Sequence, residues 1–377
     1  MKQLLNYLQS RQDAMTELAR EIVTIESPTP HKAGVDAVGA VIARELAALG
    51  ATVSYDRQTK TGDHVLGVIN AGGGSPISMI CHMDTVHPVG STAGPMPVKI
   101  EDGKLWGPGV FDMKASSVIT LNAIRALQAT GLMPKREIRM LFTSDEEMGS
   151  TTSRELIEGT AQGNALVMVM EPALSDGRLK SSRKGVGDWK ITAHGKAAHA
   201  GAEHAKGVNA IHELARQIET IQGWTDYARG VTFNVGWITG GGAVNVVPDK
   251  AEMLVDCRCE RLSDAEWTAA QFKTLTASLP GASIEVEGEW NRPPMECNAQ
   301  RLEIIKRIQA IGAELGMKVE HGASGGGSDA SFTAGMGIPT MDGFGAVGDG
   351  LHAKFEHIVL SSLPERAALS AAVLAGW

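Results

Sequence analysis

The sequence of 377 residues contains few cysteines and no long apolar segment. Its four cysteines form no CxxC pair, so a disulfide framework is not expected, and we interpret them as reduced, mostly buried thiols. No apolar run approaches the ~20 residues that span a bilayer. Residues 1–9 lack the continuous apolar core of a signal peptide. These absences favour a cytoplasmic protein.

The sequence also lacks an excess of basic residues. It has 35 lysines and arginines against 43 aspartates and glutamates, a net charge of -8. This balance gives no electrostatic basis for binding nucleic acid or an anionic membrane, so a small-molecule partner is expected. The apolar fraction of 43% is ample for packed cores, and the length exceeds the usual size of a single core.

The first half of the chain alternates helical and strand patterns. Apolar runs at 76–81, 138–143 and 165–170 predict buried strands. Apolar residues at helical spacing in 4–23 and 116–129 predict helices. The pattern is typical of an α/β fold with a mixed, largely parallel sheet flanked by helices.

A change of pattern near residue 183 predicts a second domain. Residues 184–290 contain strands and helices in an α+β unit of about domain size. The α/β pattern resumes after Arg292-Pro293-Pro294. We therefore predict a larger domain made of residues 1–183 and 291–377, with residues 184–290 inserted into it.

Potential metal ligands follow the predicted strands. His82 comes directly after the strand at 76–81, and Asp84 can accept the second ring N–H of a metal-bound imidazole. Glu146 and Glu147 follow the next strand, and one could bind metal while the other acts as general base. Ligands bind beyond the carboxyl ends of strands in such sheets. The pattern favours a hydrolytic metal centre over an acidic surface turn.

Two further carboxylates fit this hypothesis. Glu171 ends the apolar run at 165–170, and Pro172 favours an extended backbone at Glu171. Asp112 follows a Gly-Pro-Gly turn and precedes a predicted helix, so it could be an ordinary N-cap or a ligand that bridges two metals.

The remaining candidates leave alternatives open. His352 and His357 lie in one polar loop, and their spacing does not decide which is a ligand. His199 stands among small residues and could also be an ordinary loop histidine. The glycine-rich segment 325–329 lacks the Lys-Ser/Thr ending of a P-loop, but its backbone N–H groups could hold a substrate carboxylate.

With these motifs in order, the chain from about Leu66 to its C-terminus resembles the co-catalytic zinc exopeptidases. That family includes glutamate carboxypeptidase (carboxypeptidase G), aminoacylase and succinyl-diaminopimelate desuccinylase, and the resemblance is closest to the glutamate carboxypeptidase branch. The matching segments are HMDTV, GPGVFDMK, SDEEMGS, EP, GKAAHAG, GGGSDA and GLHAKFEH.

The resemblance implies a role for each candidate in a two-zinc site. His82, Asp112 and Glu171 would hold one zinc, and Asp112, Glu147 and His352 the other. Asp84 would orient His82, and Glu146 would be the general base. The resemblance favours His352 over His357. It also implies a non-proline cis peptide at Asp112-Met113.

The same resemblance implies that residues 184–290 form a lid and dimerisation domain. His199 would reach the active site of the second subunit of a homodimer and stabilise the oxyanion. Asn245, Arg258 and Arg292 match residues that contact substrate in the family. Gly327 and Ser328 of the glycine-rich loop are expected to help anchor the substrate carboxylate.

Two departures from the glutamate branch leave the substrate open. Met113 stands where that branch commonly has an acidic residue, and the match around Asp176-Gly177-Arg178 is loose. Glutamate carboxypeptidase activity is expected, with an N-acyl-amino-acid deacylase or dipeptidase on the same scaffold as the rival. A non-catalytic metal-containing binding module and a structural oligomerisation protein are more distant alternatives. Other divalent metals could replace the two zinc ions.

Overall fold

The computed structural model describes residues 1–69 and 72–377, and the chain forms two compact units. Unit 1 comprises Met1–Ser181, Cys297–Ser324 and Ser328–Trp377, and unit 2 comprises Ser182–Glu296 with Gly325–Gly327. The predicted insertion at 184–290 lies within the longer segment of unit 2. The three glycines at 325–327 join unit 2 although the sequence pattern placed them in the larger domain.

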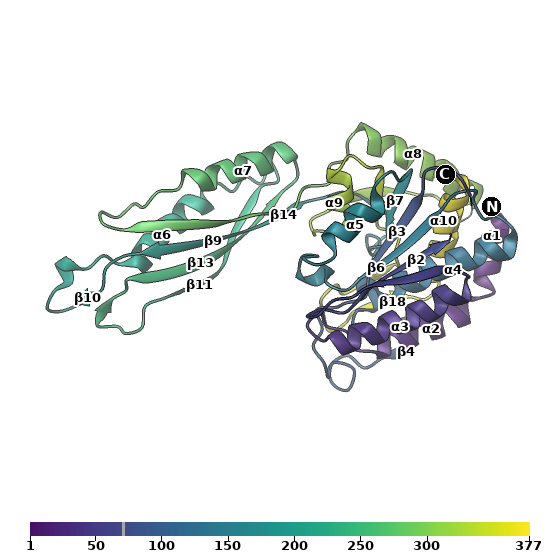
Figure 1. Ribbon diagram of the computed structural model, residues 1–377, viewed down its shortest axis with the longest axis horizontal. Helices are drawn as coiled ribbons and strands as arrows, with labels where there is room; N and C mark the ends of the chain where they lie inside the picture. The colour runs from purple at the N-terminus through teal and green to yellow at the C-terminus, as the bar shows by residue number, and fades with distance from the viewer. Residues whose placement is uncertain (70–71) are drawn as a thin grey trace. The chain divides into compact units, whose positions relative to one another are not determined.

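The core of unit 1 is an eight-stranded mixed sheet (Figure 1). Its four middle strands are parallel, and antiparallel strands flank them. The predicted fold class is therefore confirmed. Every residue of the central strand β3 is buried, as expected for a parallel strand covered on both faces. In sheet order the strands are β1 (Thr52–Asp56), β2 (His64–Ile69), β6 (Ile138–Thr143), β3 (Ile77–His82), β7 (Leu166–Val169), β16 (Thr340–Asp342), β8 (Leu179–Arg183) and β15 (His321–Ser324).

Helices cover both faces of this sheet (Figure 1). Helix α4 is buried on almost every side, because it packs between the sheet and the other helices. The helices of unit 1 are α1 (Lys2–Gln9), α2 (Gln12–Thr24), α3 (Lys32–Ala48), α4 (Ala115–Thr130), α5 (Arg154–Ala161), α8 (Ala299–Glu314), α9 (Ala330–Gly335) and α10 (Ser362–Gly376).

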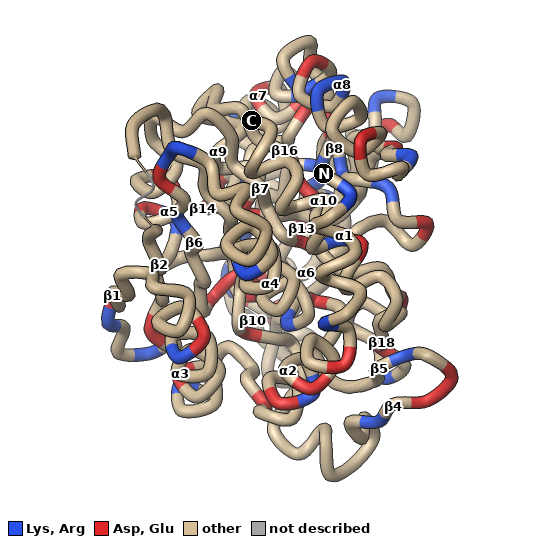
Figure 2. The backbone as a smooth tube through the Cα atoms, turned by 90° about the vertical axis from the view of Figure 1, so that its right-hand side faces the viewer, with Lys and Arg blue, Asp and Glu red and all other residues tan. Residues whose placement is uncertain are grey.

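The single helix predicted at 4–23 is wrong in one respect, because the structure has two helices there. The break falls at Ser10 and Arg11. The Ser10 hydroxyl donates to the carbonyl of Tyr7 at 2.7 Å, a local bond that competes with helix continuation. Figure 2 shows acidic and basic residues side by side on α2 and α3, where Arg44 pairs with Glu21 at 2.9 Å.

A small antiparallel sheet in unit 1 joins segments that are far apart in sequence. Its register pairs Trp106 with His357 and Leu105 with Ile358. The turn after residue 106 is thereby brought beside the loop before residue 357. The strands in order are β17 (Gly348–Asp349), β18 (His357–Val359), β5 (Lys104–Trp106) and β4 (Lys99–Glu101).

Unit 2 is a four-stranded antiparallel sheet with two helices. Alternate residues of β9 are buried, which indicates that the helices cover one face of the sheet. Trp189 and Phe272 stack there with ring centroids 4.5 Å apart. The strands in order are β11 (Thr232–Gly240), β13 (Lys250–Cys259), β9 (Gly185–His194) and β14 (Ser283–Arg292), and the helices are α6 (Ala210–Gln222) and α7 (Leu262–Thr274).

Within the described residues, no helix is both long enough and apolar enough to cross a membrane. All four cysteines are free; Cys81, Cys257 and Cys259 are buried, whereas Cys297 is exposed.

Candidate metal centre

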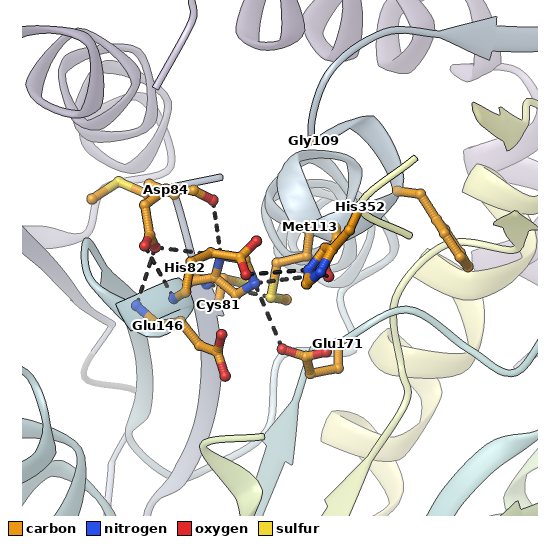
Figure 3. Close-up of polar contacts among 12 residues, drawn as sticks. Cys81, His82, Asp84, Gly109, Met113, Glu146, Glu171 and His352 are labelled. Atoms are coloured by element: carbon orange, nitrogen blue, oxygen red, sulfur yellow. Dashed lines mark hydrogen bonds and ion pairs between the residues drawn. The ribbon is translucent and has the colours of Figure 1, made fainter. Parts of the chain in front are cut away.

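The predicted metal ligands meet at the carboxyl end of the sheet in unit 1 (Figure 3). His82 is the last residue of β3, and Glu171 lies just beyond β7. Glu146 and Glu147 occupy a single turn of 3-10 helix, Glu146–Met148, soon after β6. Strands β3, β6 and β7 are parallel, so their carboxyl ends reach the same edge of the sheet.

Asp112 lies at the centre of the cluster, with one carboxylate oxygen toward each of two histidines. Its Oδ1 is 3.1 Å from Nε2 of His82, and its Oδ2 is 3.4 Å from Nε2 of His352. Nε2 of His82 also lies 3.6 Å from Oε1 of Glu171, and Nε2 of His352 lies 3.2 Å from Oε2 of Glu147. These contacts bring the expected ligands close together, and their assignment to two metals stays a prediction.

The distances fit divalent metal ions. Two donor atoms bound about 2.0 Å from a tetrahedral zinc lie about 3.3 Å apart. The donor atoms of this cluster are separated by 3.1 to 3.6 Å. In addition, Oε1 of Glu147 is buried without a hydrogen-bond partner, an arrangement that a bound cation would satisfy. The residues present therefore fit a dinuclear site.

The electrostatics of the cluster favour positive charge. Hydrogen bonds to Asp112 and Glu147 raise the pKa of His352 to about 10. Burial opposes the charge of Asp112, but hydrogen bonds from His352 and His82 outweigh burial and hold its pKa below the usual range. Burial and the negative charge of Asp112 raise the pKa of Glu147. Protons and divalent cations compete for such donors.

The orientation of His82 is set by Asp84. Nδ1 of His82 lies 3.0 Å from the backbone carbonyl of Asp84 and 3.4 Å from its Oδ1, so Nε2 points at the cluster. The Asp84 carboxylate also accepts the backbone N–H groups of Glu146 at 3.3 Å and Glu147 at 3.2 Å. Thr29 donates its hydroxyl to the same carboxylate at 2.7 Å. Asp84 thus connects the His82 strand end to the glutamate turn.

Glu146 lies at the same cluster as its neighbour. One of its oxygens, one His82 nitrogen and one Glu171 oxygen lie within 4.8 Å of one another. Figure 3 shows the carboxylates of Glu146 and Glu171 close together beside the His82 ring. The division of the two adjacent glutamates into one ligand and one general base stays a prediction. The cis peptide expected at Asp112-Met113 is confirmed.

The substrate-contacting residues expected in unit 2 are held by local interactions. The His199 ring accepts the N–H groups of Gly201 and Ala202 at Nδ1, each at 3.1 Å. The carbonyl of Asn245 accepts the N–H of Ala200 at 2.9 Å, and Arg258 pairs with Asp256 at 2.6 Å.

Arg292 and Gly327 are brought together at the end of unit 2. A Cβ on Gly327 would lie 2.7 Å from a Val186 methyl and 3.3 Å from Cδ of Arg292, so no larger residue fits without movement. Arg183 donates to the Gly327 carbonyl at 3.0 Å. Ser328, in unit 1, is buried and accepts the N–H of Ala330 at 3.1 Å.

Comparison with known proteins identifies the family to which this chain is similar. Residues 79–376 match the peptidase family M20/M25/M40. The chain is 31% identical over 374 residues to carboxypeptidase G2 of Pseudomonas sp. (strain RS-16), covering 96% of this chain and 89% of that protein. The chain belongs to the peptidase family M20/M25/M40. It is thus an enzyme of the metallopeptidase or amidohydrolase type, as the motifs predicted.

Other known proteins are similar over nearly the whole chain. Succinyl-diaminopimelate desuccinylase of Dechloromonas aromatica (strain RCB) is 27% identical over 387 residues, covering 96% of this chain and 98% of that protein. The crystal structure of a dinuclear metal-binding peptidase of the M20 family from Bacillus subtilis has a TM-score of 0.70 at 17% identity, covering 97% of this chain and 98% of that one. The structural likeness shows the fold.

Sequence reasoning missed three residues that hold parts of the candidate site. Thr29 holds Asp84, Arg183 holds Gly327, and Glu356 contacts the turn that carries Asp112. Thr29 belongs to no recognised motif. Glu356 stood in the recognised GLHAKFEH segment, four residues after His352, and its acidic side chain in that polar loop was the available signal.

Proposed function

We propose that this M20 enzyme hydrolyses an amide bond next to a free carboxylate and releases a C-terminal amino acid, with glutamate favoured, from N-acyl or peptidyl substrates. The observation that carries the proposal is the position of Asp112, with one oxygen toward His82 and the other toward His352. The similarity to carboxypeptidase G2 across nearly the whole chain supports the choice of a carboxypeptidase.

Two zinc ions are the proposed cofactors. His82, Asp112 and Glu171 would hold one ion, and Asp112, Glu147 and His352 the other. When bound, the metal pair supplies a water of lowered pKa and polarises the scissile carbonyl. Carboxylate and imidazole donors suit zinc but also accept other divalent metals.

Proton transfer is assigned to Glu146. Its carboxylate takes a proton from the attacking water and delivers it to the leaving amine, the role of a general base that then acts as an acid. Asp84 keeps His82 and the two glutamates in place through the contacts described above. This division of labour explains why two adjacent glutamates are present.

Substrate binding is assigned to residues of unit 2 and to the glycine-rich loop. His199, reaching the second subunit of a homodimer formed through residues 184–290, stabilises the tetrahedral oxyanion. An arginine can bind the substrate carboxylate with two hydrogen bonds, which suits Arg292 or Arg258. Asn245, Gly327 and Ser328 complete the proposed binding set, and the cytoplasmic location stays a prediction.

The second candidate is an N-acyl-amino-acid deacylase, a desuccinylase included, or a dipeptidase on the same scaffold. The 27% identity to a succinyl-diaminopimelate desuccinylase favours it. Met113 is buried, and its sulfur accepts the backbone N–H of His82 at 3.3 Å. The position that is commonly acidic in the glutamate branch therefore carries no charge in this chain.

A substrate panel separates these candidates. Wild-type protein loaded with zinc is assayed on N-acyl-glutamate, N-acyl-arginine, N-succinyl-diaminopimelate and simple dipeptides. Higher kcat/KM for the acyl-glutamate supports the carboxypeptidase. Equal or better turnover of the other substrates contradicts the glutamate preference, and absence of turnover by a protein that holds two metals contradicts the function itself.

A further inference from the structure

Glu356 is a buried acid that the proposed chemistry does not use. It is 1% exposed and lies four residues after His352. Its Oε1 accepts the backbone N–H groups of Phe111 at 2.8 Å and Asp112 at 2.9 Å. Its Oε2 accepts the N–H of Gly109 at 2.8 Å. One side chain therefore holds three amides of the turn that carries the bridging carboxylate.

A fourth hydrogen bond connects Glu356 to a second ligand-bearing segment. Nε2 of His87 lies 2.7 Å from Oε2 of Glu356, and the His87 nitrogen is the donor because an ionised carboxylate only accepts. His87 is 8% exposed and lies five residues after His82. The loop that leaves the His82 strand end is thereby fixed to the same carboxylate.

The backbone around Glu356 supports the same arrangement. The carbonyl of Glu356 accepts the N–H of Gly107 at 3.3 Å, next to the strand pairing of Trp106 with His357. Strand β18 therefore delivers Glu356 to the start of the Asp112 turn. His352 is on the short loop that leads to this point, so its position also depends on the contact.

We infer that Glu356 is a positioning residue that fixes the spacing of His82, Asp112 and His352 by binding the segments that carry all three. The inference rests on the ligand set of the proposed function. A carboxylate with four donors around it is a strong, oriented acceptor, because hydrogen bonds to an ionised group are stronger than neutral ones. Residues that orient metal ligands tune metal affinity without touching the metal.

The alternative is that Glu356 only stabilises the fold. Glu213 provides the matched control, because it is also fully buried and accepts the backbone N–H groups of Ser278 at 2.9 Å and Leu279 at 2.7 Å. It does so within unit 2 and is no part of the metal centre. The substitutions Glu356→Gln and Glu213→Gln both remove the charge of a buried carboxylate that accepts backbone N–H groups. The first weakens such hydrogen bonds beside the metal centre, and the second weakens them within unit 2.

The test measures zinc affinity by equilibrium competition with a chelator, together with circular dichroism of each variant. Glu356→Gln turns a pure acceptor into a group with two N–H donors, which oppose some of the four donors that face it. We expect zinc binding to weaken about 10- to 100-fold. Glu213→Gln should lower thermal stability and leave zinc affinity unchanged.

Each outcome has one meaning. Wild-type zinc affinity in Glu356→Gln overturns the inference, and so does an equal loss of affinity in Glu213→Gln. If Glu356→Gln does not fold, His87→Leu decides: it removes one of the four donors, so a smaller loss of zinc affinity supports the inference and an unchanged affinity overturns it. A wild-type protein that binds zinc but turns over no panel substrate refutes the proposed function, while the affinity comparison still tests Glu356.

Discussion

The metal centre of unit 1 and the substrate-contacting residues expected in unit 2 differ in how their surroundings hold them. Five separate segments of unit 1 bring donor atoms into four close pairs, each separated by 3.1 to 3.6 Å. In unit 2, Arg258 pairs with Asp256, and the His199 ring is bound by its own loop. The donors of unit 1 face one another, whereas those residues of unit 2 face their neighbours.

The difference teaches that metal chemistry and selectivity are built in different ways. Strand ends fixed by a buried sheet can hold several like-charged groups together until a cation neutralises them. A side chain that already pairs with a neighbour must give up that contact to bind substrate. It therefore contributes only the difference in free energy between its contact with substrate and its contact with the neighbour. We therefore expect substitutions in unit 1 to change the chemistry itself and substitutions in unit 2 to change substrate affinity.

The largest effect is expected for Asp112→Asn. Asparagine keeps the shape of aspartate but has a single oxygen, so it cannot offer one oxygen to each metal. We expect loss of at least one bound metal and a fall in kcat/KM of about 1000-fold or more. The reason is that metal ions stabilise the charge of the transition state by several kcal/mol. Metal content after dialysis and initial rates are the measurements.

The control for this substitution is Asp176→Asn. Asp176 is an exposed carboxylate that pairs with Arg178 at 2.7 Å, away from the cluster. The control should retain both metals and the wild-type rate. Two tightly bound metals in Asp112→Asn would contradict the expectation that Asp112 of unit 1 is needed to hold both metals.

Glu146→Gln should have the next largest effect. The amide cannot accept the proton of the attacking water, so kcat is expected to fall about 100- to 10,000-fold. Metal content should stay at the wild-type level, because the proposed ligands are unchanged. A variant that loses a metal instead would show that Glu146 is a ligand, which its position near His82 and Glu171 makes a direct alternative.

Much of this centre could be predicted because it depends on buried strands. The apolar run at 138–143 matches β6, and the run at 76–81 differs from β3 by one residue at each end. The residues after parallel strands meet at one sheet edge for geometric reasons, so His82, Glu147 and Glu171 could be expected to converge.

The supporting contacts could not be predicted in the same way. The bond from Thr29 to Asp84 joins residues 55 apart, and the bond from Asp112 to Glu356 joins residues 244 apart. Such pairs depend on how loops pack in three dimensions, which periodicity does not report. The close approach of Gly327 to Arg292 has the same origin, since it joins the glycine-rich loop to the end of β14.

A smaller effect is expected for Arg292→Ala in unit 2. Arg292 is 5% exposed, so its side chain is confined by its surroundings. The substitution removes this guanidinium from the site that is proposed to bind the substrate carboxylate. A hydrogen bond to a charged group contributes about 1.5 to 3 kcal/mol, so KM should rise about 10- to 100-fold with metal content unchanged. Arg258→Ala should raise KM less, because Arg258 is already paired with Asp256. A larger effect in Arg258→Ala would reverse this order.

The smallest effect concerns a charge cluster of unit 1 outside the metal centre. Burial opposes the charge of Asp63, but hydrogen bonds from Lys32, the Gln58 N–H and Arg57 outweigh burial and lower its pKa to about 2. A folded-state pKa below the unfolded value of about 3.9 stabilises the fold above pH ~4. This contribution is lost as the pH falls toward 2.

Asp63→Asn tests whether charge pairing stabilises unit 1 independently of its metals. In the metal-free proteins, the variant should unfold with a free energy about 1 to 2 kcal/mol lower at pH 7, because one partner of Asp63 is largely exposed and its contribution is screened. The difference from wild type should shrink at pH 3, measured by urea unfolding followed with far-UV circular dichroism. Zinc affinity should stay unchanged. A weakened affinity would mean that the charge cluster around Asp63 and the metal centre are not independent.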